Sequence, residues 1–291
     1  MDKKDWLRFW LLGVVWGTSF LWIKIAVTEV SPLVLVSFRT LFGALGLGLI
    51  LLLSPGARPN RAMLRRALPP FILVALFNVA IPFTLISWAE KFIDSGTASI
   101  LNSATPLFSI MLAPLMVKDD PFTWRKLSGL LVGFLGVFIL ISPQLGQKIN
   151  NNIIGQGAML LATVSYAAAT IFARKSGQGL PAPSQSLLQV GMAAGFIIPV
   201  TLVVEQPLKL PTLPITWLAL VWLGLLGSCV AYLLFFTLLH NIGPTRTTTV
   251  TYTLPLFGVI LGAVFLGEPI FIQSILGGAL IISGVLLVNR R

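Results

Sequence analysis

Long apolar stretches alternate with short polar connections along the whole chain. A transmembrane helix needs about 20 mostly apolar residues, and ten stretches approach or exceed that length. They are Leu7–Val27, Leu33–Leu53, Leu68–Trp88, Thr97–Val117, Leu127–Ile141, Ile153–Phe172, Ser184–Val204, Trp217–Leu239, Thr247–Leu266 and Phe271–Val288. The short alternating segments typical of a membrane β-barrel do not occur. The pattern therefore predicts an all-α integral membrane protein with ten transmembrane helices.

The segment from Ser95 to Val137 returns in the second half of the chain, from Pro244 to Val285. Pro106-Leu107-Phe108 matches Pro255-Leu256-Phe257 at an offset of 149 residues, and Pro121, Gly129 and Gly136 match Pro269, Gly277 and Gly284 at 148. We therefore predict two five-helix repeats, 1–146 and 147–291. Because five is odd, the second repeat is expected to enter the membrane inverted. Inverted repeats place a substrate site near the bilayer midplane.

The composition supports a membrane protein and narrows its partners. The chain is 56% hydrophobic and 10% charged, whereas soluble domains are about 25% charged. A net charge of +11 would suggest nucleic acid as a partner of a soluble protein. In a membrane protein, however, positive charge in the loops orients the helices. The net charge is explained in this way, and no nucleic acid partner is expected. With one cysteine and one histidine, we expect no disulfide framework, metal site or cofactor.

The distribution of lysine and arginine predicts the orientation. With the N-terminus inside, fifteen of the twenty basic residues fall in cytoplasmic segments, three fall in outer loops, and Lys24 and Arg39 lie within helices. Cytoplasmic loops carry the excess of positive charge in membrane proteins. Both termini are therefore predicted to be cytoplasmic, in a bacterial inner membrane.

Three prolines inside the predicted helices mark candidate polar sites. A proline lacks the N–H that would bind the carbonyl four residues earlier. The resulting pairs are Pro82 with Asn78, Pro106 with Asn102, and Pro255 with Thr251. In each pair the carbonyl that lacks its helical hydrogen bond belongs to a residue with a polar side chain. Such a group of polar atoms is tolerated in a membrane only where it faces a cavity or another helix.

These residues define a predicted substrate-binding set of hydroxyl, amide and aromatic groups near the midplane. The set is Trp16, Asn78, Ser99, Asn102, Ser103, Tyr166, Tyr232, Thr248, Thr251 and Tyr252. Asn78, Asn102 and Thr251 are expected to meet around one cavity, with the aromatic rings as its wall. The alternative for each hydroxyl is a contact between closely packed helices.

Three charged residues are possible contacts of the substrate. Lys24 is expected to extend towards the membrane surface, and Arg39 either faces the cavity or anchors its helix to a carbonyl. All nine acidic residues fall at helix ends or in loops, with Glu90 and Asp94 closest to the core. Because a buried carboxylate is the usual proton site of a coupled transporter, we predict facilitated export or exchange rather than tight proton antiport.

Several motifs together resemble a known group of transporters. They are Trp16-Gly17 with Lys24 following, Ser31-Pro32 before Phe38-Arg39, the Ser95–Phe108 block, Glu268-Pro269, and the final Gly277–Gly284 helix. The chain resembles the drug/metabolite transporter superfamily, specifically the ten-helix bacterial exporters built of two EamA domains. The resemblance implies export of amino acids, related metabolites or toxic small molecules across the inner membrane. Asp120-Pro121 departs mildly from it, because an E-P turn would fall there.

The predicted function is a carrier, not an enzyme, that moves small amphipathic molecules by alternating access through a central cavity between the repeats. A nucleotide-sugar or phosphate-sugar exchanger is an alternative, but it requires more basic residues in the cavity than Lys24 and Arg39. A non-transporting membrane enzyme or scaffold is another; the lone His240 has no acidic neighbour in sequence for a catalytic set. A channel would need a filter motif. The protein is expected to be a monomer or a homodimer.

Overall fold

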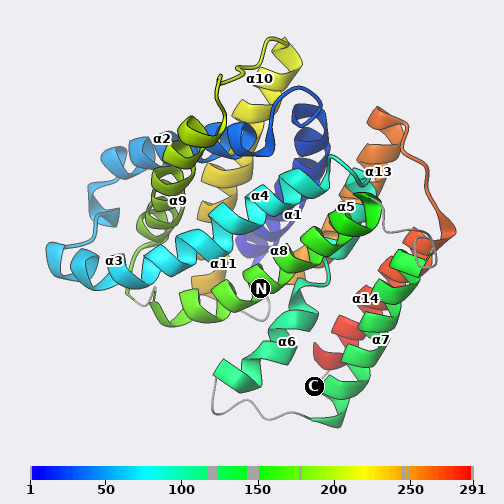
Figure 1. The fold of residues 1–291 in the computed structure, drawn as a ribbon. Helices are drawn as coiled ribbons and strands as arrows, with labels where there is room; N and C mark the ends of the chain where they lie inside the picture. The colour runs from blue at the N-terminus through cyan, green and yellow to red at the C-terminus, as the bar shows by residue number, and fades with distance from the viewer. Residues whose placement is uncertain are drawn as a thin grey trace.

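The computed structural model describes residues 2–116, 123–142, 151–176, 179–243, 247 and 249–289. Within these ranges the chain is helical and contains no strand (Figure 1). Eight helical segments are long and apolar enough to cross a membrane, and Ile272–Leu287 is a shorter apolar helix. The predicted all-α membrane protein is confirmed.

The helices follow the predicted spans closely. They are α1 Lys3–Ala26, α2 Pro32–Leu53, α3 Arg61–Ala75, α4 Ile81–Ala89, α5 Ser95–Asn102, α6 Thr105–Met116, α7 Trp124–Ile141, α8 Asn151–Ser176, α9 Ala182–Val204, α10 Pro214–Val221, α11 Ala231–Ile242, α13 Leu254–Leu266 and α14 Ile272–Asn289. Shorter 3-10 and π segments are η1 Pro55–Ala57, η2 Leu76–Ala80, η4 Trp222–Val230 and η5 Thr249–Thr253. Two of the predicted spans therefore contain a widened π segment in their middle, α3–η2–α4 and α10–η4–α11.

The span predicted as one helix over Thr97–Val117 differs from the structure, because a turn at Ser103 and Ala104 separates α5 from α6. Pro106 follows this turn and lacks the N–H that a continuous helix would need. The hydroxyl of Thr105 donates to the carbonyl of Asn102 at 2.7 Å. The corresponding span of the second half is likewise irregular, with η5 leading into α13 just before Pro255.

The repeat extends further than the literal sequence matches. The ends of α1 and α8, at Ala26 and Ser176, are 150 residues apart, as are the first residues of α2 and α9, and those of α4 and α11. The π segments η2 and η4 end at Ala80 and Val230, at the same spacing. The predicted boundary between the repeats, at 146 and 147, falls outside the described residues.

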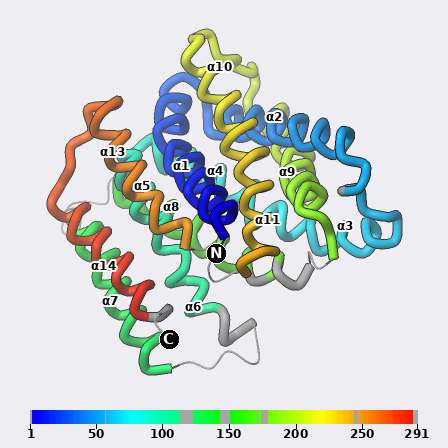
Figure 2. The backbone as a smooth tube through the Cα atoms, turned by 180° about the vertical axis from the view of Figure 1, so that it is seen from behind, coloured from blue at the N-terminus to red at the C-terminus, as the bar shows by residue number. Residues whose placement is uncertain are grey.

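A close contact joins α7 and α14, which are the corresponding last helices of the two predicted repeats. The two helices lie side by side (Figure 2). A Cβ added to Gly136 would lie 2.6 Å from the carbonyl oxygen of Gly277, and one added to Gly284 would lie 2.5 Å from that of Gly129. The two helices are therefore antiparallel. Gly129 corresponds to Gly277, and Gly136 corresponds to Gly284. Exchanging the two repeats therefore turns the contact between Gly136 and Gly277 into the contact between Gly284 and Gly129, as a two-fold axis would.

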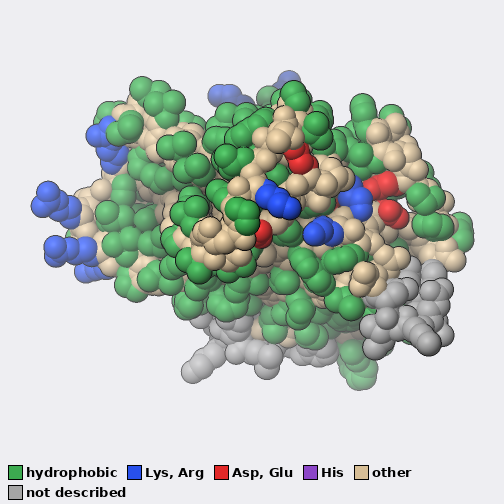
Figure 3. All heavy atoms as spheres, turned by 45° about the horizontal axis from the view of Figure 1, so that its top comes forward, with side chains coloured by type: hydrophobic (Ala, Val, Ile, Leu, Met, Phe, Trp, Pro, Cys, Tyr) green, Lys and Arg blue, Asp and Glu red, His purple; other side chains and the backbone are tan. Residues whose placement is uncertain are grey.

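Apolar side chains cover much of the outer surface, as expected for contact with lipid (Figure 3). Examples are Leu53, Leu161 and Val203, which lie on α2, α8 and α9. The buried interior lies among α1, α2, α4, α8, α9 and α11 together with η2 and η4. Polar groups in this interior have no access to lipid or loops and are the candidates for a site.

Candidate substrate site

A buried polar network lies where the two π segments approach α2 and α9. Arg39 on α2 donates from Nε to the hydroxyl of Ser228 in η4 at 3.1 Å. Asn78 in η2 donates from Nδ2 to the Oε1 of Gln189 on α9 at 2.8 Å. All four side chains are buried. The network therefore joins the first repeat to the second through two hydrogen bonds.

The two hydrogen bonds are related by the internal symmetry. At the spacing of 150 residues, Arg39 corresponds to Gln189 and Asn78 corresponds to Ser228. Exchanging the repeats turns the bond from Arg39 to Ser228 into the pair formed by Gln189 and Asn78. This is the relation expected if the repeats are related by a two-fold axis, and of the four residues only Arg39 carries a charge.

Arg39 has an unusual environment for a buried charge. Its side chain is 4% exposed, and its guanidinium lies 3.7 Å from the centroid of the Phe83 ring, in cation–π geometry. Its titratable neighbours include Tyr166, Tyr232 and Glu90, and no described carboxylate forms an ion pair with it. Burying arginine in a membrane helix costs about 2.5–3.5 kcal/mol on insertion scales, and such residues serve mainly in function.

Aromatic rings border the network. Tyr232 on α11 donates its hydroxyl to the carbonyl of Asn78 at 3.1 Å, the carbonyl to which Pro82 cannot donate. The proline thus marks a polar backbone group that meets another helix, as the sequence predicts. The ring of Tyr232 lies 6.0 Å from that of Trp16 on α1 in a T-shaped arrangement. At a spacing of 150 residues, Tyr166 on α8 is the counterpart of Trp16, and both are half-buried.

Other members of the predicted set lie on α5 and η5. The hydroxyls of Ser99 and Ser103 donate to carbonyls of their own helix, those of Gly96 and Ile100. They fit the packing alternative, and Ser99 also closely approaches Gly258 of α13. The side-chain oxygen of Asn102 is buried without a hydrogen-bond partner among the described residues.

Thr251 and Tyr252 lie in η5 and are half-buried, whereas Thr248 lies outside the described residues. Asn78 is joined to Gln189 on α9, while Asn102 belongs to α5, which packs mainly on α13 and α8. The meeting of Asn78, Asn102 and Thr251 around one cavity stays a prediction.

The structure corrects the expectations for Lys24 and for buried acids. Lys24 does not extend towards the surface, because its Nζ donates to the backbone carbonyls of Glu90 and Ile93 at 2.7 and 2.8 Å. The Glu90 side chain is fully buried, so the prediction that no carboxylate lies in the core is wrong. α4 ends at Ala89, and α8 covers the following turn: a Cβ added to Gly155 would lie 3.2 Å from the Ala89 carbonyl oxygen.

Three contributors were absent from the predicted set: Gln189, Ser228 and Phe83. Gln189 and Ser228 interrupt apolar stretches in the middle of their helices. Their 150-residue relation to Arg39 and Asn78 is the signal that identifies them. Phe83 directly follows Pro82 in an apolar stretch and carries no such signal.

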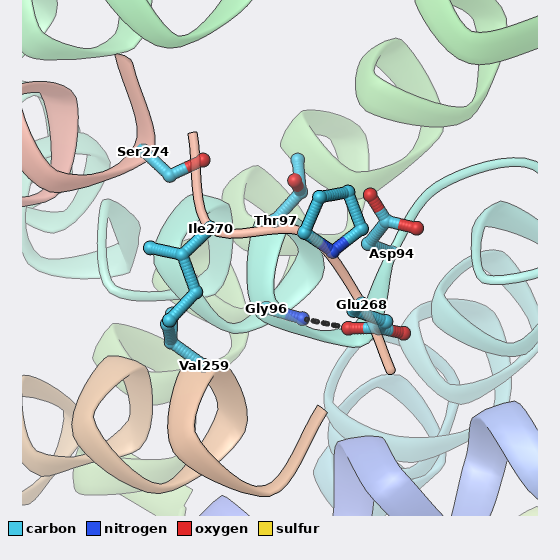
Figure 4. Close-up of a pocket in the computed structure, with 8 residues that line it drawn as sticks. Asp94, Gly96, Thr97, Val259, Glu268, Ile270 and Ser274 are labelled. Atoms are coloured by element: carbon cyan, nitrogen blue, oxygen red, sulfur yellow. Dashed lines mark hydrogen bonds between the residues drawn. The ribbon is translucent and has the colours of Figure 1, made fainter. Parts of the chain in front are cut away.

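A second polar junction lies at the start of α5 (Figure 4). The carboxylate of Glu268 accepts hydrogen bonds from the backbone N–H of Ser95 at 2.9 Å, the Ser95 hydroxyl at 2.8 Å and the N–H of Gly96 at 3.1 Å. A carboxylate is stabilised at a helix N-terminus by the free N–H groups and the helix dipole. The Glu268-Pro269 motif therefore fastens the α13–α14 turn to α5 of the other repeat.

The comparisons with known proteins agree with these features. A model described as the EamA-like transporter family matches residues 7–142 and again residues 153–290. The uncharacterized inner membrane transporter YedA of Escherichia coli (strain K12) is 28% identical over 290 residues, covering 96% of this chain and 88% of that protein. The uncharacterized transporter YvbV of Bacillus subtilis is 24% identical, covering 96% of this chain and 90% of that protein.

Two further similarities concern the substrate of one relative and the fold. The probable terminal-alkyne amino-acid exporter of Streptantibioticus cattleyicolor is 26% identical over 239 residues, covering 81% of this chain and 77% of that protein. One solved crystal structure superposes with a TM-score of 0.68 at 16% identity, covering 99% of this chain and 97% of that one. At this identity it supports the fold alone.

Proposed function

Because the chain belongs to the EamA-like transporter family, we propose that it is an inner-membrane carrier that exports neutral amphipathic amino acids or related metabolites by alternating access. The observation that carries the proposal is Arg39, a buried cation without an acidic partner among the described residues, whose guanidinium lies over the ring of Phe83. The amino-acid class is supported by the name of the S. cattleyicolor relative and by the chemistry of the network.

Each part of an amphipathic amino acid has a partner in this site. A guanidinium can bind a carboxylate through two parallel charge-assisted hydrogen bonds. Trp16 and Tyr232 offer ring faces and edges to an apolar or aromatic side chain. At the position that corresponds to Arg39 in the second repeat, Gln189 carries a neutral amide instead of a second cation. The two sides of the site therefore differ in charge, which lets the site distinguish the two ends of the substrate.

The symmetry supports alternating access. Inverted repeats adopt two related conformations with the site between them. The bond from Arg39 to Ser228 and the bond from Asn78 to Gln189 occupy corresponding positions in the two repeats. A conformational change that exchanges the geometries of the repeats would preserve both types of contact. The inward-facing and outward-facing states are thus expected to be close in energy.

The alternative of a nucleotide-sugar or phosphate-sugar exchanger has less support. Two or more phosphate charges call for several cations in the site, whereas the buried network contributes one, Arg39. Lys24 is engaged with two backbone carbonyls near the end of α4. The alternative of a membrane scaffold that does not transport is tested by measuring the flux of amino acids into proteoliposomes.

The purified protein in proteoliposomes is expected to exchange labelled L-phenylalanine for unlabelled L-phenylalanine inside the vesicles. Uptake should saturate with concentration and should show counterflow, which separates a carrier from a channel. L-leucine, L-methionine and L-threonine complete the panel, and phenethylamine, which lacks the carboxylate, should compete poorly. Absence of exchange for every amino acid in the panel would contradict the proposed function.

We also propose that both termini are cytoplasmic, on the basis of the Lys and Arg distribution. In a Cys229→Ala background, single cysteines at Lys148 and Lys209 should react with a membrane-impermeant maleimide in intact cells. Cysteines at Arg61 and Lys175 should react only after permeabilisation. The opposite pattern of labelling would reverse the orientation.

A further inference from the structure

Glu90 is a buried acid that the contacts of the fold do not explain. Its side chain has no exposed surface, and neither carboxyl oxygen has a hydrogen-bond partner within the described residues. By contrast, Glu268 and Glu29 accept several hydrogen bonds each. A carboxylate that only shaped the fold would be expected to have such donors.

The charged groups around Glu90 come from several elements. Lys24 of α1, Arg39 of α2 and Glu268 of the α13–α14 turn all act electrostatically on its carboxyl group. Asp94, at the start of α5, interacts with Lys24 and Glu268 in the same way. On α8, Gly155 packs against Ala89, Phe92 and Ile93, and the next residue, Gln156, has a buried side-chain oxygen without a described partner.

The ammonium of Lys24 does not neutralise Glu90 directly. Its hydrogen bonds go to the backbone carbonyls of Glu90 and Ile93, and no ion pair to the carboxylate forms. Burying an ionised carboxylate without donors costs far more than burying the neutral acid. With its carboxyl group buried and without donors, Glu90 is therefore a carboxylic acid that holds a proton.

We propose that Glu90 is the coupling site of the carrier, where a proton and the ammonium group of the amino acid compete for the same carboxylate. When the site opens to water, the O–H bond of Glu90 breaks, the proton passes to water and a carboxylate is left. That anion then attracts the substrate ammonium, while Arg39 receives the substrate carboxylate. One proton is thus exchanged for one zwitterion.

This inference rests on the proposed function and deepens it. It explains why the core has both a cation and an acid without an ion pair between them. It also replaces the expectation of uncoupled exchange, because that expectation depended on the absence of a buried carboxylate. Export of amino acid would be coupled to entry of protons.

Proton release on binding tests the inference without transport. Saturating L-phenylalanine, added to the purified protein in weakly buffered detergent solution with a pH indicator, should release up to one proton per bound molecule. N-acetyl-L-phenylalanine, which has no ammonium group, should bind without releasing a proton. The Glu90→Gln variant should release none with either compound.

The coupling is measured in proteoliposomes with an imposed pH gradient. In the native protein the gradient should drive accumulation of L-phenylalanine up to about tenfold, the limit for one proton exchanged across about one pH unit. Glu90→Gln should abolish this accumulation and weaken exchange. Glu29→Gln is the matched control: hydrogen bonds, first from the Thr212 hydroxyl, lower the pKa of Glu29 to about 2, so this group carries no proton between about pH 5 and 8.

The outcomes separate the two proposals. If no amino acid is exchanged by the native protein, the proposed function is wrong. If L-phenylalanine binds and is exchanged but no proton is released, the coupling role of Glu90 alone is overturned. Should Glu90→Gln fail to fold, the measurements on the native protein with the two ligands still decide the question.

Discussion

Replacing Arg39 with methionine is expected to lower amino-acid exchange in proteoliposomes by about two orders of magnitude. Methionine keeps the buried apolar stem but removes the charge and every donor. Losing a buried, hydrogen-bonded charge pair costs about 2–5 kcal/mol, and each 1.4 kcal/mol is a factor of ten. Because Arg39 forms no ion pair among the described residues, its removal breaks no ion pair in this structure.

Two further variants show whether the loss belongs to the site. Arg39→Lys keeps the charge but not the planar fork, so exchange should be intermediate. Arg58→Met removes an exposed arginine that donates to the carbonyls of Leu51 and Leu52, and exchange should stay near the native rate. Native-like exchange by Arg39→Met would show that Arg39 only anchors α2 to Ser228.

The second large effect is expected for stability. Gly136→Leu places a side chain against the backbone of α14, where a Cβ alone would lie 2.6 Å from the Gly277 carbonyl oxygen. Backbone atoms cannot move aside as the end of a flexible side chain can, so α7 and α14 must separate. Overpacking typically costs 1–3 kcal/mol and occasionally more. At roughly 3 kcal/mol, the Tm in detergent should fall by roughly 6–12 °C.

Gly157→Leu is the matched control, because nothing lies within 4 Å of a Cβ added at that position of α8. This variant should unfold near the native temperature. If both leucine variants had the same Tm, the close contact between α7 and α14 would not contribute to stability. Gly277→Leu should match Gly136→Leu, since the two glycines oppose each other.

Much of the fold could be predicted from the sequence because membrane helices are encoded locally. The lengths of the apolar stretches predict the membrane spans, and the repeated prolines and glycines predict two related halves. The interruption between α5 and α6 was less accessible, because proline tolerates either a kink or a break. The hydroxyls of Ser103 and Thr105 donate to nearby carbonyls. Whether the helix kinks or breaks at Pro106 depends on the geometry of these side chains.

The site was only partly predictable, for a different reason. Pro82 correctly pointed to the carbonyl of Asn78, because the loss of an N–H is a local property. The partners Gln189 and Ser228 lie more than a hundred residues away from Asn78 and Arg39, and helix packing brings them together. Glu90 was misjudged because its position at a helix end suggests exposure, whereas α8 and Lys24 cover that end.

The junction at Glu268 has a consequence for the timing of conformational change. Hydrogen bonds to a charged group contribute about 1.5–3 kcal/mol each. A motion that carries the α13–α14 turn away from α5 must break all three bonds to one carboxylate. Roughly 3 kcal/mol of interaction not recovered at the barrier slows such a step more than a hundredfold. The dwell time of the joined arrangement is therefore governed by a single side chain, whatever molecule occupies the site.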